Sequence, residues 1–327
     1  MTGQPKKKPK YEAVLLKPPS TSPPSTGPDH FIPPAPPADF FNTIHQGEAT
    51  NKLARIKTKI TDPGQLDLYG NGVVTSEDFK VFIQEYEKLS GGVRPTAKKL
   101  LDALIITATE SGQTDTMVRL PLAQYMQMRG LKDVKEARKQ VRQDIEALDA
   151  ISIEFREKRR GKTGDYLKMS ISGGTNGLVR GVILYRFNTD FFNVMLNYPV
   201  MPFPKEILRL NSRHNPNSEF FLRRIAEHKN MNIGKPNEDI IGVKTLLLSS
   251  PELPRYADLG EKGQVSQRII DPFERDMDAL DILEWHYCGK NGAPCDPPKN
   301  YAEFERARVR IVWKTYPERL DRGKKKK

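Results

Sequence analysis

Residues 117–148 read MVRLPLAQYMQMRGLKDVKEARKQVRQDIEAL, and this stretch decides the fold of the surrounding region. Its first residues alternate in polarity, which predicts a short strand over 117–120. Residues 121–128 have the spacing of a short helix, and Gly130 is placed to end that helix in a left-handed conformation. Asp133 is a good N-cap with a glutamate three residues later, so a second and longer helix is predicted to begin there.

This second helix is predicted to carry its apolar and its basic side chains on different faces. The apolar face consists of Val134, Ala137, Val141, Ile145 and Leu148. The basic side chains recur at the spacing i, i+3, i+4 and i+7, and they are Lys135, Arg138, Lys139 and Arg142. A helix, a tight turn and a helix with a basic stripe are typical of a DNA-binding helix-turn-helix. A basic stripe alone is equally typical of a solvated surface helix, so the assignment depends on the residues after this helix.

A β-hairpin is predicted directly after this helix. Residues 151–155 alternate apolar and polar side chains, and residues 167–171 do so on the return. The connection over 156–165 contains glycine and four basic residues that are expected to contact phosphates, namely Lys158, Arg159, Arg160 and Lys162. Helix, turn, basic helix and basic-tipped hairpin is the order of a winged-helix domain.

The same order is predicted a second time after a turn-rich link at residues 234–237. Three helices are expected over 240–248, 253–259 and 265–280, followed by a hairpin of residues 282–287 and 309–313. The DNA-contact candidates near the start of the third helix are Gln267 and Arg268, whereas Trp285 and Trp313 are expected to pack in the core. Sequence identity between the two halves is negligible, so only a similar architecture is predicted.

The remaining segments complete the predicted organisation. Further helices are expected over 76–89, 95–109, 205–210 and 218–229, with a strand over 182–187 and an extended link over 198–204. The fold class is therefore α+β, with two tandem winged-helix domains over 55–233 and 234–317. Residues 1–37 are rich in Pro, Ser and Thr and are predicted to be a disordered basic arm, and residues 318–327 a basic tail.

Charge and composition restrict the class of partner. The chain has 327 residues and a formal net charge of +12, which favours a polyanion such as nucleic acid or an anionic membrane surface. No apolar run reaches the roughly 18 residues of a transmembrane helix, and no apolar run follows the N-terminal lysines as in a signal peptide. The two cysteines, Cys288 and Cys295, lack zinc-site spacing and do not predict a disulfide framework. We therefore expect a cytoplasmic protein without a cofactor or membrane partner.

Residues 67–317 resemble the theta-type replication initiators of bacterial plasmids and mobile elements, which use tandem winged helices. The stretches that carry the resemblance are Lys98–Asp102, Ala137–Gln140, Asp144–Leu148, Ile151–Phe155, Tyr185–Phe187 and Val309–Trp313. The resemblance implies sequence-specific binding of double-stranded DNA at directly repeated origin sites. It also implies a homodimer formed through the first domain, and recruitment of host replication proteins such as the helicase or its loader. In that family the second winged helix often makes the dominant groove contacts, whereas here the first domain has the more basic helix. A winged-helix transcriptional repressor is the alternative.

Catalytic sites are not predicted. Gly161-Lys162-Thr163 lacks the earlier glycine of a phosphate-binding loop, because Arg156 occupies that position. Residues 67–78 only loosely follow a calcium-binding loop, with Tyr69 at a ligand position. A rolling-circle nickase, the less favoured enzyme reading, requires paired metal-binding histidines, and no two of the five histidines lie within a few residues of each other. The chain is therefore expected to have no catalytic residue and no metal site.

Overall fold

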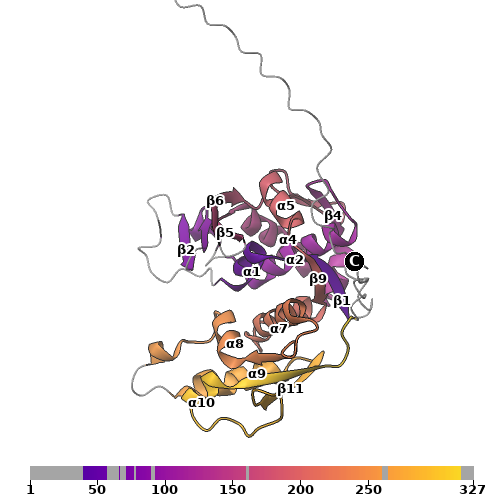
Figure 1. Cartoon of the computed structure of the whole chain (residues 1–327). Coiled ribbons are helices and arrows are strands. Elements are labelled where there is room, and N and C mark those ends of the chain that lie inside the picture. Colours follow the sequence, from indigo (N-terminus) through magenta and orange to yellow (C-terminus); the bar gives the residue numbers. More distant parts are fainter. Residues whose placement is uncertain are drawn as a thin grey trace, which may run out of the picture. The chain divides into compact units, whose positions relative to one another are not determined.

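The chain folds into a mixed α/β structure (Figure 1), obtained as a computed structural model. The structure describes residues 40–56, 66, 71–76, 79–89, 93–159, 162–259 and 264–317, and of residues 48, 76, 88, 157–159 and 162–166 it describes only the backbone. By their contacts, all of these residues belong to one compact body. The predicted arm over 1–37 and the tail over 318–327 lie outside the described residues.

The segment of residues 117–148 folds largely as predicted. Strand β4 (Met117–Pro121) leads into α3 (Leu122–Arg129), and α4 (Val134–Asp149) follows after the glycine turn. Helix α2 (Pro95–Glu110) begins with proline at its first position and packs against α4 and β4. Strands β7 (Gly177–Val179) and β8 (Val182–Arg186) form a three-stranded antiparallel sheet with β4, in the order β4-β8-β7. Helices α2, α3 and α4 and this sheet are called the first unit below.

The predicted hairpin of residues 151–171 forms, but it belongs to a different sheet. Strands β5 (Ile151–Arg159) and β6 (Lys162–Ser170) extend a four-stranded sheet of order β2-β3-β5-β6. Strands β2 (Gly72–Ser76) and β3 (Phe79–Ile83) precede α2 in the chain. The hairpin is thus an insertion between α4 and β7.

The helix predicted over 76–89 is wrong. Its first part is strand β3, and only a 3-10 turn over Tyr86–Leu89 is helical. Phe79, Val81 and Ile83 alternate toward the core and are fully buried. The apolar spacing in this short segment fits periods of both 2 and 3.6 residues, and pairing with β5 selects the strand.

Regular structure is present before residue 55, the position at which the first domain was predicted to begin. Strand β1 (Phe41–His45) pairs antiparallel with β9 (Val200–Pro204), so the predicted extended link is a paired strand. Helix α1 (Glu48–Arg55) follows β1, and α5 (Thr189–Leu196) and α6 (Glu206–Arg209) flank β9.

The aromatic ring of Phe41 ties the start of the described chain to its end. Its centroid lies 5.3 Å from that of Tyr316 and 6.2 Å from that of Trp313. The Tyr316 hydroxyl also donates to Asn230 Oδ1 at 3.0 Å. Residues that precede α1 and follow the last strand therefore share one aromatic cluster.

The second half forms another three-stranded sheet, of order β10-β12-β11. Helix α7 (Ser218–Asn232) precedes β10 (Ile240–Gly242) and α8 (Val243–Ser249), and a short 3-10 turn follows at Tyr256–Leu259. A π-helical turn (Ser266–Ile270) continues into α9 (Asp271–Asp278), with proline in its first turn. Strands β11 (Leu283–Cys288) and β12 (Arg308–Trp313) are joined through α10 (Tyr301–Arg306).

Apart from the inserted β5–β6 hairpin in the first half and α10 in the second, both halves have the order helix, strand, two further helices and two strands. In both sheets the last strand lies in the middle, between the first strand and its hairpin partner. The expected similarity of architecture between the two halves is present, but the elements of the second half are not those predicted. Residues 240–242 form a strand and not the start of a helix, and α7 is the first helix of the second unit. The proposed domain boundary at residue 234 stays a prediction.

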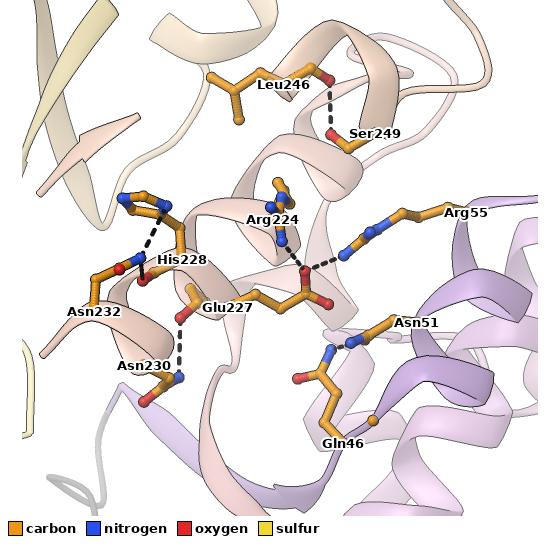
Figure 2. A network of polar contacts seen from close by, with 12 residues as sticks. Gln46, Asn51, Arg55, Arg224, Glu227, His228, Asn230, Asn232, Leu246 and Ser249 are labelled. Atoms are coloured by element: carbon orange, nitrogen blue, oxygen red, sulfur yellow. Dashed lines mark hydrogen bonds and ion pairs between the residues drawn. The ribbon is translucent and has the colours of Figure 1, made fainter. Parts of the chain in front are cut away.

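The joint between α2 and α7 is built from buried ion pairs. Glu219, Arg223 and Glu227 recur every fourth residue along α7 and are all buried. Lys99 Nζ lies 3.2 Å from a carboxylate oxygen of Glu219, and the Arg223 guanidinium pairs with Asp102. Glu227 pairs with Arg55 of α1 and with Arg224 (Figure 2). Because both partners of the central pair are buried, removal of either one leaves an uncompensated charge.

Candidate nucleic-acid interface

The turn between α3 and α4 has the backbone geometry that its sequence predicts. Gly130 adopts a φ of 66°, in the left-handed region that favours glycine. The Leu131 amide donates to the Met126 carbonyl at 2.9 Å, which closes the end of α3. The Asp133 carboxylate accepts from the Lys135 and Glu136 amides at 2.7 and 3.0 Å, so Asp133 is the N-cap as expected.

Arg129 fixes the end of α3 from the side. Its Nη1 donates to the buried Tyr125 hydroxyl at 2.8 Å, and its Nε donates to the Leu208 carbonyl of α6 at 2.8 Å. Burial raises the pKa of Tyr125 to about 12, so the phenol stays protonated and accepts this bond at neutral pH. The α3–α4 turn is thus attached to a segment about 80 residues later in the chain.

The inner face of α4 packs on the core. Ala137, Val141, Ile145 and Leu148 are each at most 5 % exposed. Val134, which was predicted on this face, is 50 % exposed, because it is the first helical residue and precedes the turn that reaches the core.

The outer face of α4 presents the predicted basic stripe to solvent. Lys135, Arg138, Lys139 and Arg142 are all exposed. Within the described part of the chain, no ion pair engages any of these four side chains. Cations that form no ion pair with another described residue can bind a polyanion without breaking such a pair.

Asp144 lies on the buried side of the same helix and is only 1 % exposed. Its Oδ1 accepts from Thr96 Oγ1 at 2.7 Å, whereas its Oδ2 has no partner among the described residues. Desolvation raises the pKa of Asp144 from 3.8 to about 6, so the ionised carboxylate is unfavourable in the folded state.

Asp144→Asn is therefore expected to stabilise the protein, with a gain that depends on pH. A raised folded-state pKa means that stability is lost as pH rises from the unfolded value through about 6. The neutral amide removes this loss, so the gain should approach roughly 2–3 kcal/mol at pH 8 and be small near pH 4. Urea unfolding at both pH values measures it, with Glu146→Gln on the exposed face as control. An equal gain at both pH values would show that ionisation is not the cause.

Two hairpins follow α4: β5–β6 lies in the sheet of β2 and β3, whereas β7–β8 lies in the sheet of β4. The side chains of Lys158, Arg159 and Lys162 lie outside the described residues, as does Arg160 altogether, so their predicted contacts stay predictions. The second hairpin, β7–β8, has a two-residue turn between the paired residues Val179 and Val182.

Arg180 and Gly181 form this turn, with φ values of 48° and 80°, which is typical of a tight hairpin. Arg180 is exposed, and the Gly181 carbonyl accepts from the first amide of α3, that of Leu122, at 2.8 Å. Arg180 was not among the contacts predicted from the sequence. Its signal was an Arg-Gly pair between two valines, which is short enough to be overlooked next to the longer hairpin.

In the second half, Gln267 and Arg268 are exposed in the π-helical turn, as a groove-contacting role requires. The helix after this turn also exposes Asp271 and Asp278, so it lacks a continuous basic stripe like that of α4. Trp285 packs edge-on against Phe273 with centroids 6.0 Å apart, and its Nε1 donates to Asp278 at 2.8 Å. Both interactions agree with the structural role predicted for Trp285.

Other sequence predictions concern metals, disulfides, membranes and phosphate loops. The described residues contain no cluster of three or more potential metal ligands, and Cys288 and Cys295 are free thiols. No helix in the described ranges is long and apolar enough to span a membrane. Lys162 lies in strand β6, so the residues around it do not start a helix as a phosphate-binding loop requires.

Comparisons with known proteins give structural matches of low similarity. No protein-family model matches the chain, and no curated protein does. Among solved structures, domains 2 and 3 of RctB as the selenomethionine derivative match with a TM-score of 0.40 and 14% identity, covering 81% of this chain and 99% of that one. A second structure of RctB domains 2–3 matches with a TM-score of 0.36 and 12% identity, covering 81% and 97%. Values this low carry no argument about function.

Proposed function

We propose that this chain binds double-stranded DNA, with α4 as the helix that enters the major groove. The carrying observation is the exposed row of Lys135, Arg138, Lys139 and Arg142 on a helix whose opposite face is buried. The left-handed turn at Gly130 ends α3, and the N-cap at Asp133 starts this helix. A basic, solvent-facing second helix suits a major groove about 12 Å wide.

The unit that presents α4 is a winged helix in this proposal. Support comes from the order α2, β4, α3, α4 and a terminal hairpin, with the last strand paired to β4. The hairpin that shares this sheet is β7–β8, so Arg180 joins the predicted phosphate contacts. The same topology in the second half supports a second winged helix, with Gln267 and Arg268 near the start of its third helix.

The biological role proposed is initiation of replication at a plasmid or mobile-element origin. It rests on the family resemblance of the sequence and on the two like units, which suit directly repeated sites. Homodimer formation and recruitment of a host helicase or its loader belong to the same proposal. A transcriptional repressor with winged helices is the second candidate, because exposed basic helices serve both roles.

DNA binding is tested with duplexes from the region that flanks the gene. The full chain should bind one of these duplexes more tightly than a scrambled duplex of equal length and composition, at about 150 mM salt. Equal affinity for both would reject site-specific initiation. A transformation assay with the flanking DNA, with the gene intact or deleted, then separates the two roles. An initiator is required for plasmid maintenance, and a repressor is not.

The hairpins are tested by the salt dependence of binding. Arg180→Ala should weaken binding to all sequences alike and reduce the slope of log Kd against log salt by about 0.9, the value for one phosphate contact. The double variant Arg159→Ala/Arg160→Ala should reduce it by about twice as much. Fluorescence anisotropy over a salt series measures both. A variant that changed base preference while the slope stayed constant would contradict a phosphate-contact role for its hairpin.

A further inference from the structure

Helix α6 (Glu206–Arg209) is a single turn that contacts both repeated units. On one side, Glu206 Oε1 accepts from the Asp281 amide at 2.8 Å and Oε2 accepts from the Ile282 amide at 3.1 Å. These two amides belong to the turn between α9 and β11. The carboxylate therefore holds the turn that follows α9, the helix into which the Ser266–Ile270 turn with Gln267 and Arg268 continues.

On its other side, α6 holds the turn between α3 and α4. The Leu208 carbonyl accepts from Arg129 Nε at 2.8 Å. Arg209 approaches the last carbonyls of α3, with Nε 3.4 Å from the Met128 oxygen and Nη2 3.5 Å from the Gln127 oxygen. Arg209 and Glu206 thus engage backbone groups of different units from opposite ends of one helical turn.

The middle of α6 cannot shift easily relative to the core. Ile207 and Leu208 are fully buried. The preceding strand β9 is paired with β1, and the Lys205 amide donates to the Phe40 carbonyl at 3.0 Å. A displacement of the turn held by Glu206 therefore cannot be absorbed by movement of α6 itself.

We propose that Glu206 is a positioning residue that fixes the distance and angle between α4 and the Gln267–Arg268 turn. The inference rests on the proposed function, since it concerns how two DNA-contacting elements are spaced. In B-DNA one base pair more or less between two contact sites changes their separation by about 3.4 Å and rotates them by about a tenth of a turn. Two DNA-contacting elements at a fixed distance bind the altered duplex more weakly, whereas elements that can move relative to each other bind it with little loss of affinity.

The experiment selects duplexes from a random library with the wild-type chain and then inserts one to five base pairs between the two enriched motifs. Wild type is expected to lose affinity on the order of tenfold at the first insertion, since DNA must be twisted or bent to compensate. Glu206→Ala should bind the parent duplex and the one-base-pair insertion with affinities within about threefold of each other. Glu284→Ala, an exposed glutamate on β11, is the matched control and should keep the wild-type preference.

Other outcomes overturn the inference in distinguishable ways. If Glu206→Ala is folded and keeps the wild-type spacing preference, Glu206 is only structural. If the wild-type chain enriches one motif without a second motif at a fixed distance, binding has no spacing preference, and Glu206 cannot set one. Should Glu206→Ala not fold, Glu206→Gln, which retains one acceptor oxygen, replaces it in the same measurement and is judged by the same spacing preference. If no duplex is enriched, or if Arg138→Ala/Arg142→Ala binds like wild type, the proposed function itself fails.

Discussion

The double variant Arg138→Ala/Arg142→Ala is expected to bind its selected duplex about 100-fold more weakly than wild type while keeping its thermal stability. Each side chain that contacts a base or phosphate contributes roughly 1–3 kcal/mol, and these two lie one turn apart on the exposed face of α4. Neither takes part in an ion pair within the described ranges, so no ion pair between described residues is lost. Anisotropy titrations at fixed salt and a thermal unfolding curve provide the two readouts.

A matched control comes from the same helix. Glu146→Ala removes an exposed charge from the far end of α4, and it should leave affinity within about threefold of wild type. A double arginine variant with wild-type affinity would show that the stripe is an ordinary solvated face. A variant that bound weakly because it had unfolded would be recognised from its melting curve.

Asp102→Ala is expected to destabilise the protein by roughly 3–5 kcal/mol, because it leaves Arg223 charged and buried without its partner. Arg223 is 1 % exposed, and its guanidinium carbon lies 5.2 Å from the centroid of the Phe203 ring, so bulk solvent does not reach its charge. Urea unfolding of the full chain measures the loss.

The double variant Asp102→Leu/Arg223→Met should recover most of this stability, since apolar groups of similar size often replace a buried ion pair without loss. Equal destabilisation by the single and the double variant would mean that packing, and not the unpaired charge, sets the effect. Lys244→Ala, which removes the exposed partner of the partly exposed Glu305, should cost less than about 1 kcal/mol.

Sequence reasoning succeeded where structure is decided locally. Gly130 and Asp133 stand within one turn of the groups that they cap, so their roles follow from residue type and position. The basic and apolar faces of α4 separate at helical spacing, and only the terminal Val134 departs from this pattern. The outward orientation of the four cations was predictable for the same reason.

Sequence reasoning failed where residues far along the chain determine the local structure or contact. Residues 79–83 become a strand because β5 lies beside them, and residues 200–204 because β1 does. Arg180 was missed because membership of a sheet depends on pairing between β4 and β8, which are far apart in the chain. Glu206 was missed because the amides that it binds belong to the second unit.

The aromatic cluster around Phe41 affects the order in which the protein is built. Phe41 is among the first described residues to leave the ribosome, whereas Trp313 and Tyr316 are among the last. Contacts between such distant residues form slowly and only after long stretches of chain have been synthesised. A nascent chain therefore keeps a large apolar ring without two of its aromatic neighbours until translation is nearly finished, and a premature stop shortly before residue 313 would leave it without them permanently.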